Sequence, residues 1–161
     1  MQILVGGVGY GCLRDLSFGP IAIERLKKLE WPEGVEVEDV SYNPIAVVQK
    51  LTEQSYDKVV FIGAMGRGRL QGGIYRYRPD GTLPDKEEIQ LRVGEAVTGV
   101  ISLENLVIIC ATFDALPRDT VIIEVEPADD QWGEGLSATV EPAVERVIEM
   151  VKEEVQVAVH G

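Results

Sequence analysis

Histidine is nearly absent from this chain: its 161 residues include only His160, next to the C-terminal end. Unless that end folds back, the chain holds no Ser-His-Asp triad, no Cys-His nucleophile pair and no histidine-bound zinc. Cysteine is scarce too, since Cys12 and Cys110 lie far apart and form no Cys-x-x-Cys motif. They indicate neither a disulfide framework nor a zinc knuckle and are typical of a protein of the reducing cytoplasm.

Positive charge is also in short supply. The chain has 15 Lys and Arg against 27 Asp and Glu, a net charge of −12. Such a balance repels nucleic-acid phosphates and anionic membrane surfaces, so neither is predicted as a partner. The start MQILVGGVGYG lacks the basic and long apolar regions of a signal peptide, and no apolar run reaches the ~20 residues of a membrane span. We expect a mature cytoplasmic protein.

The N-terminal half alternates between strand and helix patterns. Residues 3–5, 35–39 and 58–63 are apolar or alternating runs, and the last is typical of a strand buried on both faces. Helical spacing follows Ser17, a candidate N-cap, and again follows Asn43-Pro44. The expected apolar helix positions are Phe18, Ala22, Leu26 and Leu29 in the first helix, and Ile45, Val48 and Leu51 in the second.

The C-terminal half begins with a pattern that predicts a β-hairpin. Its strands would be 74–78 and 89–93, because Ile89, Leu91 and Val93 alternate with polar residues beyond a Pro-Asp-Gly turn. A buried helix from Leu103 to the Leu-Pro pair at 116–117, a strand over 121–126 and a polar loop over 127–137 follow. A long amphipathic helix over 140–155 ends the pattern, with Pro142 in its first turn and Ser137 or Thr139 as its cap.

Together these segments predict one α/β domain over residues 1–161. Its sheet would be mostly parallel, with about five strands, helices on both faces and the hairpin inserted after the third strand. The glycines after the first strand suggest a dinucleotide turn, but Gly7-Val8-Gly9 would need a further glycine where Cys12 stands. They therefore favour a tight turn over a nucleotide site.

A more specific pattern runs through nearly the whole chain. Its members, in order, are Gly7-Val8-Gly9-Tyr10, Leu13, Asp15, Gly19, Asp39, Val59 to Gly63, Gly72-Gly73-Ile74-Tyr75, Ile101-Ser102-Leu103, Leu116-Pro117, Val121 to Glu126 and Leu136-Ser137. In order and spacing the chain resembles the hydrogenase maturation proteases, which trim the C-terminus of nickel-iron hydrogenase large subunits. The resemblance implies a single α/β domain, and a hydrogenase large-subunit precursor as partner.

The resemblance also implies that nickel, already inserted in the precursor, is recognised by three side chains. These are an acidic residue after the first strand, an aspartate after the third and a histidine before the next helix. Here the positions hold Leu16, Gly63 and Glu104, and Tyr10 replaces the usual asparagine of the first turn. Nickel is expected from the family, yet its ligands are replaced, so no cofactor is predicted.

The remaining carboxylates near these positions allow two interpretations. Asp15 and Glu104 would form a repurposed metal or catalytic site that holds or polarises the substrate, or else Asp15 caps a helix and Glu104 is solvated. Asp15 would point about 100° away from Leu16 around a helix, or to the opposite face if the turn is extended. Cys12, between a glycine turn and a helix, is a candidate reactive thiol or a small packing residue.

Arginines form a basic cluster after the third strand. Arg67 and Arg69, with Arg76 and Arg78 further along, would contact an anion or acidic peptide, or would be solvated loop and edge charges. Tyr75 and Tyr77 would share one hairpin face. Trp132 would cover the end of the sheet or, as an exposed aromatic in a polar loop, would anchor a partner. The expected substrate or partner contacts are Gly7, Gly9, Asp39, Gly63, Arg67 and Arg69.

Two functions follow from these observations. In the first, the chain is a hydrogenase maturation protease-like protein that processes or binds the C-terminal region of a large subunit. In the second, it is a non-catalytic homologue that uses the same cleft for a protein partner or a small acidic ligand, because a fold does not carry its function once the site is replaced.

Overall fold

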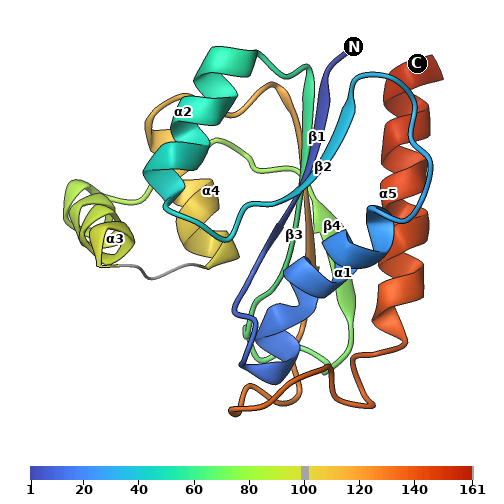
Figure 1. Ribbon diagram of the computed structural model, residues 1–161. Coiled ribbons are helices and arrows are strands. Elements are labelled where there is room, and N and C mark those ends of the chain that lie inside the picture. Colours follow the sequence, from blue (N-terminus) through green and yellow to red (C-terminus); the bar gives the residue numbers. More distant parts are fainter. Residues whose placement is uncertain (99–101, 161) are drawn as a thin grey trace.

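A computed structural model describes residues 1–98 and 102–160, arranged as a five-stranded sheet with helices on both faces (Figure 1). The elements are β1 (Ile3–Val8), the short 3-10 turn η1 (Arg14–Ser17), α1 (Phe18–Leu26), β2 (Val35–Asp39), α2 (Pro44–Gln54), β3 (Lys58–Ala64), β4 (Ile74–Tyr77), α3 (Lys86–Val97), α4 (Leu103–Thr112), β5 (Asp119–Val125) and α5 (Ala143–His160). Within these residues no helix combines the length and apolarity that crossing a membrane requires.

The strands lie in the order β2-β1-β3-β5-β4. The first four are parallel to one another, and β4 pairs with β5 in the antiparallel sense. β1, β3 and β5 are covered on both faces, which explains why their sequences are apolar runs and not alternating ones. The predicted fold class is confirmed.

Two apolar cores hold the layers together. Helices α1 and α5 cover one face of the sheet, and α2 and α4 cover the other, with α3 outermost beside α4 (Figure 1). Phe18 and Val147 belong to the first core, whereas Phe61 and Leu106 belong to the second. All four side chains are buried, and such burial is the main favourable contribution to the free energy of folding.

Glycines let helix α1 approach the sheet closely. A Cβ on Gly19 would lie 2.4 Å from the Val8 carbonyl oxygen, and one on Gly9 would lie 2.1 Å from that of Leu16. Backbone atoms cannot yield at such distances, so only glycine fits. The first glycine turn is thus explained by packing, as the tight-turn interpretation expects.

The predicted hairpin is wrong, because residues 86–97 form helix α3 and not a second strand. The Asp85 side chain caps this helix by accepting a hydrogen bond from the Glu88 amide at 2.8 Å, and Glu87 and Glu88 occupy its first turn. Acidic residues there are favourable because the helix N-terminus carries partial positive charge. Ile89 and Val93 are also one helical turn apart, so their spacing fits both structures.

Smaller expectations also need correction. Helix α1 ends at Leu26, so Leu29 lies beyond it. In α2 Val47 is buried and Ile45 is 38% exposed, so the apolar stripe is displaced around the helix. Helix α5 begins at Ala143, after Pro142, and the expected cap Ser137 instead donates its hydroxyl to Asp15.

Candidate functional site

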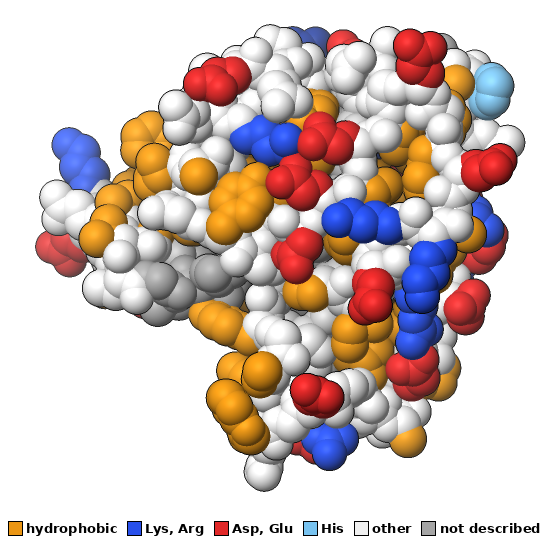
Figure 2. Space-filling model, in the orientation of Figure 1, with side chains coloured by type: hydrophobic (Ala, Val, Ile, Leu, Met, Phe, Trp, Pro, Cys, Tyr) orange, Lys and Arg blue, Asp and Glu red, His pale blue; other side chains and the backbone are white. Residues whose placement is uncertain are grey.

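The sheet reverses its winding between β1 and β3, because the chain passes from β1 to β2 and returns to the other side of β1. Ligands of such sheets bind beyond the carboxyl ends of the strands at this point. A cavity of about 280 Å³ lies here, which we call the switch-point cavity; its lining includes Val8, Tyr10, Leu16, Met65, Leu103 and Asp130. Figure 2 shows a hollow at the lower left of the molecule, with hydrophobic side chains along its lower wall.

Asp15 is buried beside this cavity and points into the loop between β5 and α5. Its carboxylate accepts hydrogen bonds from the Ala128, Asp129 and Ser137 amides at 2.8–2.9 Å and from the Ser137 hydroxyl at 2.8 Å. Burial alone would raise the pKa of Asp15, but these hydrogen bonds outweigh it and the pKa is lowered. The Asp15 carboxylate holds the loop between β5 and α5 in place. Its catalytic or metal-binding role stays a prediction, which this geometry does not favour.

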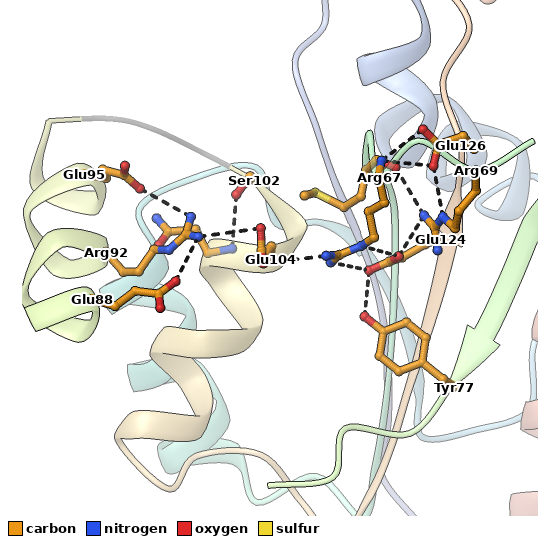
Figure 3. A network of polar contacts seen from close by, with 12 residues as sticks. Arg67, Arg69, Tyr77, Glu88, Arg92, Glu95, Ser102, Glu104, Glu124 and Glu126 are labelled. Atoms are coloured by element: carbon orange, nitrogen blue, oxygen red, sulfur yellow. Dashed lines mark hydrogen bonds and ion pairs between the residues drawn. The ribbon is translucent and has the colours of Figure 1, made fainter. Parts of the chain in front are cut away.

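Arg67 and Arg69 bind Glu124 of β5 and Glu126, which directly follows that strand (Figure 3). Arg67 donates two hydrogen bonds to Glu124, both at 3.0 Å, and its amide donates to Glu126. Arg69 lies 2.9 Å from a Glu126 oxygen and 3.1 Å from a Glu124 oxygen. The acidic partners of these arginines therefore belong to the same chain, and a further anion would have to compete with them.

Glu124 is the centre of this cluster, with a side chain only 1% exposed. It also accepts a hydrogen bond from the Tyr77 hydroxyl at 2.6 Å. Burial would raise the pKa of Glu124, but Arg67, Tyr77 and Arg69 together lower it, so the carboxylate is held ionised. Burial is the largest cause that raises the pKa of Tyr77, and the hydrogen bond to Glu124 and the negative charge of Glu124 raise it further, whereas Arg67 and Arg69 act in the opposite direction.

Glu104 bridges the cluster to helix α3. One of its oxygens lies 3.6 Å from Arg67, and the other lies 3.7 Å from Arg92 of α3. Figure 3 shows the carboxylate between the two guanidinium groups, with Glu88 and Glu95 on the far side of Arg92. Glu104 is partly exposed and links α3 to the β3–β4 loop through these two ion pairs. A shared metal or catalytic role of Glu104 and Asp15 stays a prediction.

The other candidate residues lie around the same edge of the sheet or beyond it. Cys12 is exposed, and Asp39 accepts a hydrogen bond from the Ser41 amide at 2.9 Å beside a separate cavity of about 420 Å³. Trp132 is 80% exposed, so the expectation that it covers the sheet is wrong. Arg76 pairs with Glu153, and Arg78 with Asp119. Ile101, part of the pattern behind the resemblance, lies outside the described residues.

Sequence reasoning missed Glu124, Glu126 and Arg92. The glutamates have a detectable signal, because two carboxylates at the end of a buried apolar strand need cationic partners and the arginine loop can supply them. Arg92 was hidden by the mistaken assignment of its helix to a strand.

Comparisons with known proteins agree with this architecture. No protein-family model matches the chain, and no curated protein matches it either. Solved structures do match. The hydrogenase maturating endopeptidase HybD from E. coli shares 24% identity and a TM-score of 0.76, over 98% of this chain and 94% of that one. The [NiFe] hydrogenase maturation protease HycI from Thermococcus kodakarensis shares 26% identity and a TM-score of 0.70, over 96% and 92%.

The chain has the fold of the hydrogenase maturation proteases. A hydrogenase 2 maturation peptidase from Thaumarchaeota archaeon SCGC_AB-539-E09 agrees to the same extent, with 24% identity and a TM-score of 0.71 over 97% of this chain and 99% of that one. The resemblance seen in the sequence is therefore supported by structure along nearly the whole length. Because identity is low, the likeness concerns the fold, and the site has to be judged from its own residues.

Those residues do not fit a nickel site of the kind the resemblance implies. Leu16 offers hydrocarbon, Gly63 offers no side chain, and Glu104 is paired with two arginines. Among residues 1–98 and 102–160, no three His, Cys, Asp or Glu side chains are grouped closely enough to hold a metal ion. What the site presents is an apolar cavity beside a fixed array of charges, which suits contact with a polypeptide.

Proposed function

We propose that this chain is a hydrogenase maturation protease-like protein that binds the C-terminal region of a nickel-iron hydrogenase large subunit and processes it. The observation that carries the proposal is the agreement in fold, over 96–98% of the chain, with proteins named as hydrogenase maturation proteases. The place of the switch-point cavity supports it, because α/β sheets bind their ligands there.

The partner is then a large-subunit precursor, met in the cytoplasm. Three of the six residues expected to contact it, Gly63, Arg67 and Arg69, lie at or just after the carboxyl end of β3, and Met65 and Gly66 between them line the switch-point cavity. The alternative, a non-catalytic homologue, gains no support of its own from the arginines, because their acidic partners are internal.

Affinity capture tests the proposal. The purified chain is mixed with large-subunit precursor from the same organism and, as the matched control, with the same subunit lacking its C-terminal extension. We expect capture of the precursor and at least tenfold weaker capture of the shortened subunit. Failure to capture either form, or equal capture of both, would refute recognition of the C-terminal region.

A further inference from the structure

The three positions at which the resemblance implies nickel recognition are closed to a metal ion in different ways. Leu16 contributes a hydrocarbon side chain to the switch-point cavity. At Gly63 even a single Cβ would lie 3.1 Å from the Val8 carbonyl oxygen and 3.1 Å from the Leu103 Cβ. A side chain at this position would require Val8 or Leu103 to shift by a few tenths of an ångström, and Gly63 itself offers no ligand atom.

Glu104, at the third position, is engaged on both sides. Its two oxygens face Arg67 at 3.6 Å and Arg92 at 3.7 Å. A divalent cation arriving at this carboxylate would meet two guanidinium groups, whose positive charges disfavour it at close range. Arg67 cannot turn aside cheaply, because two hydrogen bonds at 3.0 Å fix it to the buried Glu124.

Asp15 cannot take over the task from its neighbour Leu16. Both of its oxygens already accept hydrogen bonds, four in all, from Ala128, Asp129 and Ser137. Turning it toward the cavity would leave three backbone amides without this partner, and buried donors without a partner destabilise the fold. The loop between β5 and α5 therefore fixes Asp15 where it is.

We propose that this chain recognises the polypeptide of its partner and not the nickel ion, so that it binds nickel-loaded and nickel-free large-subunit precursor with the same affinity. The inference rests on the proposed function for the identity of the partner. In place of side chains that recognise a metal ion, the chain has two fixed features, the switch-point cavity and the Arg67–Glu104–Arg92 bridge. The cavity offers its occupant mainly hydrocarbon, from Val8, Leu16, Met65 and Leu103. The bridge anchors the first turn of α4 at Glu104, the residue next to Leu103.

The first experiment concerns the chain alone. Nickel chloride is titrated calorimetrically into the full chain after removal of metals with EDTA, and into Glu104→Gln and His160→Ala. We expect that the wild-type chain has no saturable nickel site that depends on Glu104, so that Glu104→Gln and the wild type give the same titration. Weak binding lost only in His160→Ala would be a terminal imidazole site and agrees with the proposal. One equivalent of nickel bound by the wild type and lost in Glu104→Gln would overturn it.

The second experiment compares affinities for the precursor loaded with nickel and the precursor prepared without it. For the wild type, we expect the dissociation constants of the loaded and nickel-free precursor to agree within a factor of two. We expect the same agreement between the two precursor forms for Glu104→Gln. A preference of tenfold or more for the loaded form would overturn the inference and leave the proposed function standing. If neither form binds, the proposed function fails, and the titration of the chain alone still decides whether nickel is recognised.

Discussion

Asp15 shows how a single residue of the expected site serves the fold. The sequence places it beside a ligand position, whereas the structure turns it into the β5–α5 loop, where three amides and a hydroxyl surround it. Its residue type and place in the chain were readable from the sequence. Its partners were not, because Ala128, Asp129 and Ser137 lie more than a hundred positions away, and no local pattern encodes that contact.

Replacing Asp15 with asparagine should strongly destabilise the protein. An amide keeps one acceptor oxygen but turns hydrogen atoms toward amides that themselves donate, so buried donors lose their partner. We expect the free energy of unfolding to fall by about 2–4 kcal/mol, measured by urea denaturation. The exposed Asp130→Asn is the control and should change it by less than about 0.5 kcal/mol. A loss for Asp15→Asn as small as that of the control would show that these hydrogen bonds do not stabilise the loop.

The buried carboxylates predict an acid-sensitive fold. The pKa values of Asp15, Glu124 and Glu126 are lowered in the folded state, because hydrogen bonds and arginines outweigh the effect of burial. Stabilisation by such groups is complete above their unfolded pKa values near 4, and is lost as pH falls through the lower folded values. We expect the melting temperature to be nearly constant from pH 7 to 5 and to drop below pH 4. Asp15→Asn should flatten that drop, and an unchanged acid limb would contradict the assignment.

At the scale of elements, the loop between β3 and β4 is held by charge. Arg67 and Arg69 bind Glu124 and Glu126 at the end of β5, and the Arg69 guanidinium lies 4.0 Å from the centre of the Tyr75 ring. Buried glutamates with such partners are costly to leave unpaired, so the loop and the end of β5 should behave as one unit.

Removing Glu124 should release this loop. In Glu124→Ala the arginines lose their central partner, and we expect trypsin to cleave after Arg67 or Arg69 at least ten times faster than in the wild type, followed by mass spectrometry. The matched control is Glu153→Ala, which removes an exposed partner of Arg76 and should leave cleavage in the loop unchanged. Equal cleavage rates in both variants would mean that the loop is held by other contacts.

The ion pair between Glu104 and Arg92, which links α4 to α3, can be measured as a coupling energy. Glu104→Gln, Arg92→Met and the double variant form a cycle whose interaction energy we expect to be about 0.5–1 kcal/mol, because both side chains are partly exposed. Urea denaturation of the four proteins gives the value. A coupling indistinguishable from zero would show that the contact does not tie α3 to the rest.

Most elements were predictable and their exceptions have physical causes. Strands β1, β3 and β5 are covered on both faces and therefore read as apolar runs, and α5 shows its apolar stripe directly. Helix α3 was wrongly predicted as a strand. It packs mainly on α4 and needs few apolar residues, so its sequence pattern is too sparse to distinguish a helix from a strand. The signal that decides it is the cap at Asp85.

For the whole molecule, the sequence indicated both the fold and the replacement of the nickel-reading residues. It could not indicate what fills their place. The bridge of Glu104 joins residues from three separate elements, and the switch-point cavity takes its lining from four segments of the chain. Such constellations depend on the tertiary arrangement, which is why the arginines looked available for an external anion although their partners are internal.

The proposed function of this chain is action at the C-terminus of a hydrogenase large subunit. Intact-mass spectrometry of the precursor after incubation with the purified chain tests this most directly, with precursor alone as the control. We predict loss of a C-terminal segment, with and without nickel in the precursor. An unchanged mass with a stable complex would indicate the non-catalytic homologue, and an unchanged mass without any complex would contradict the account.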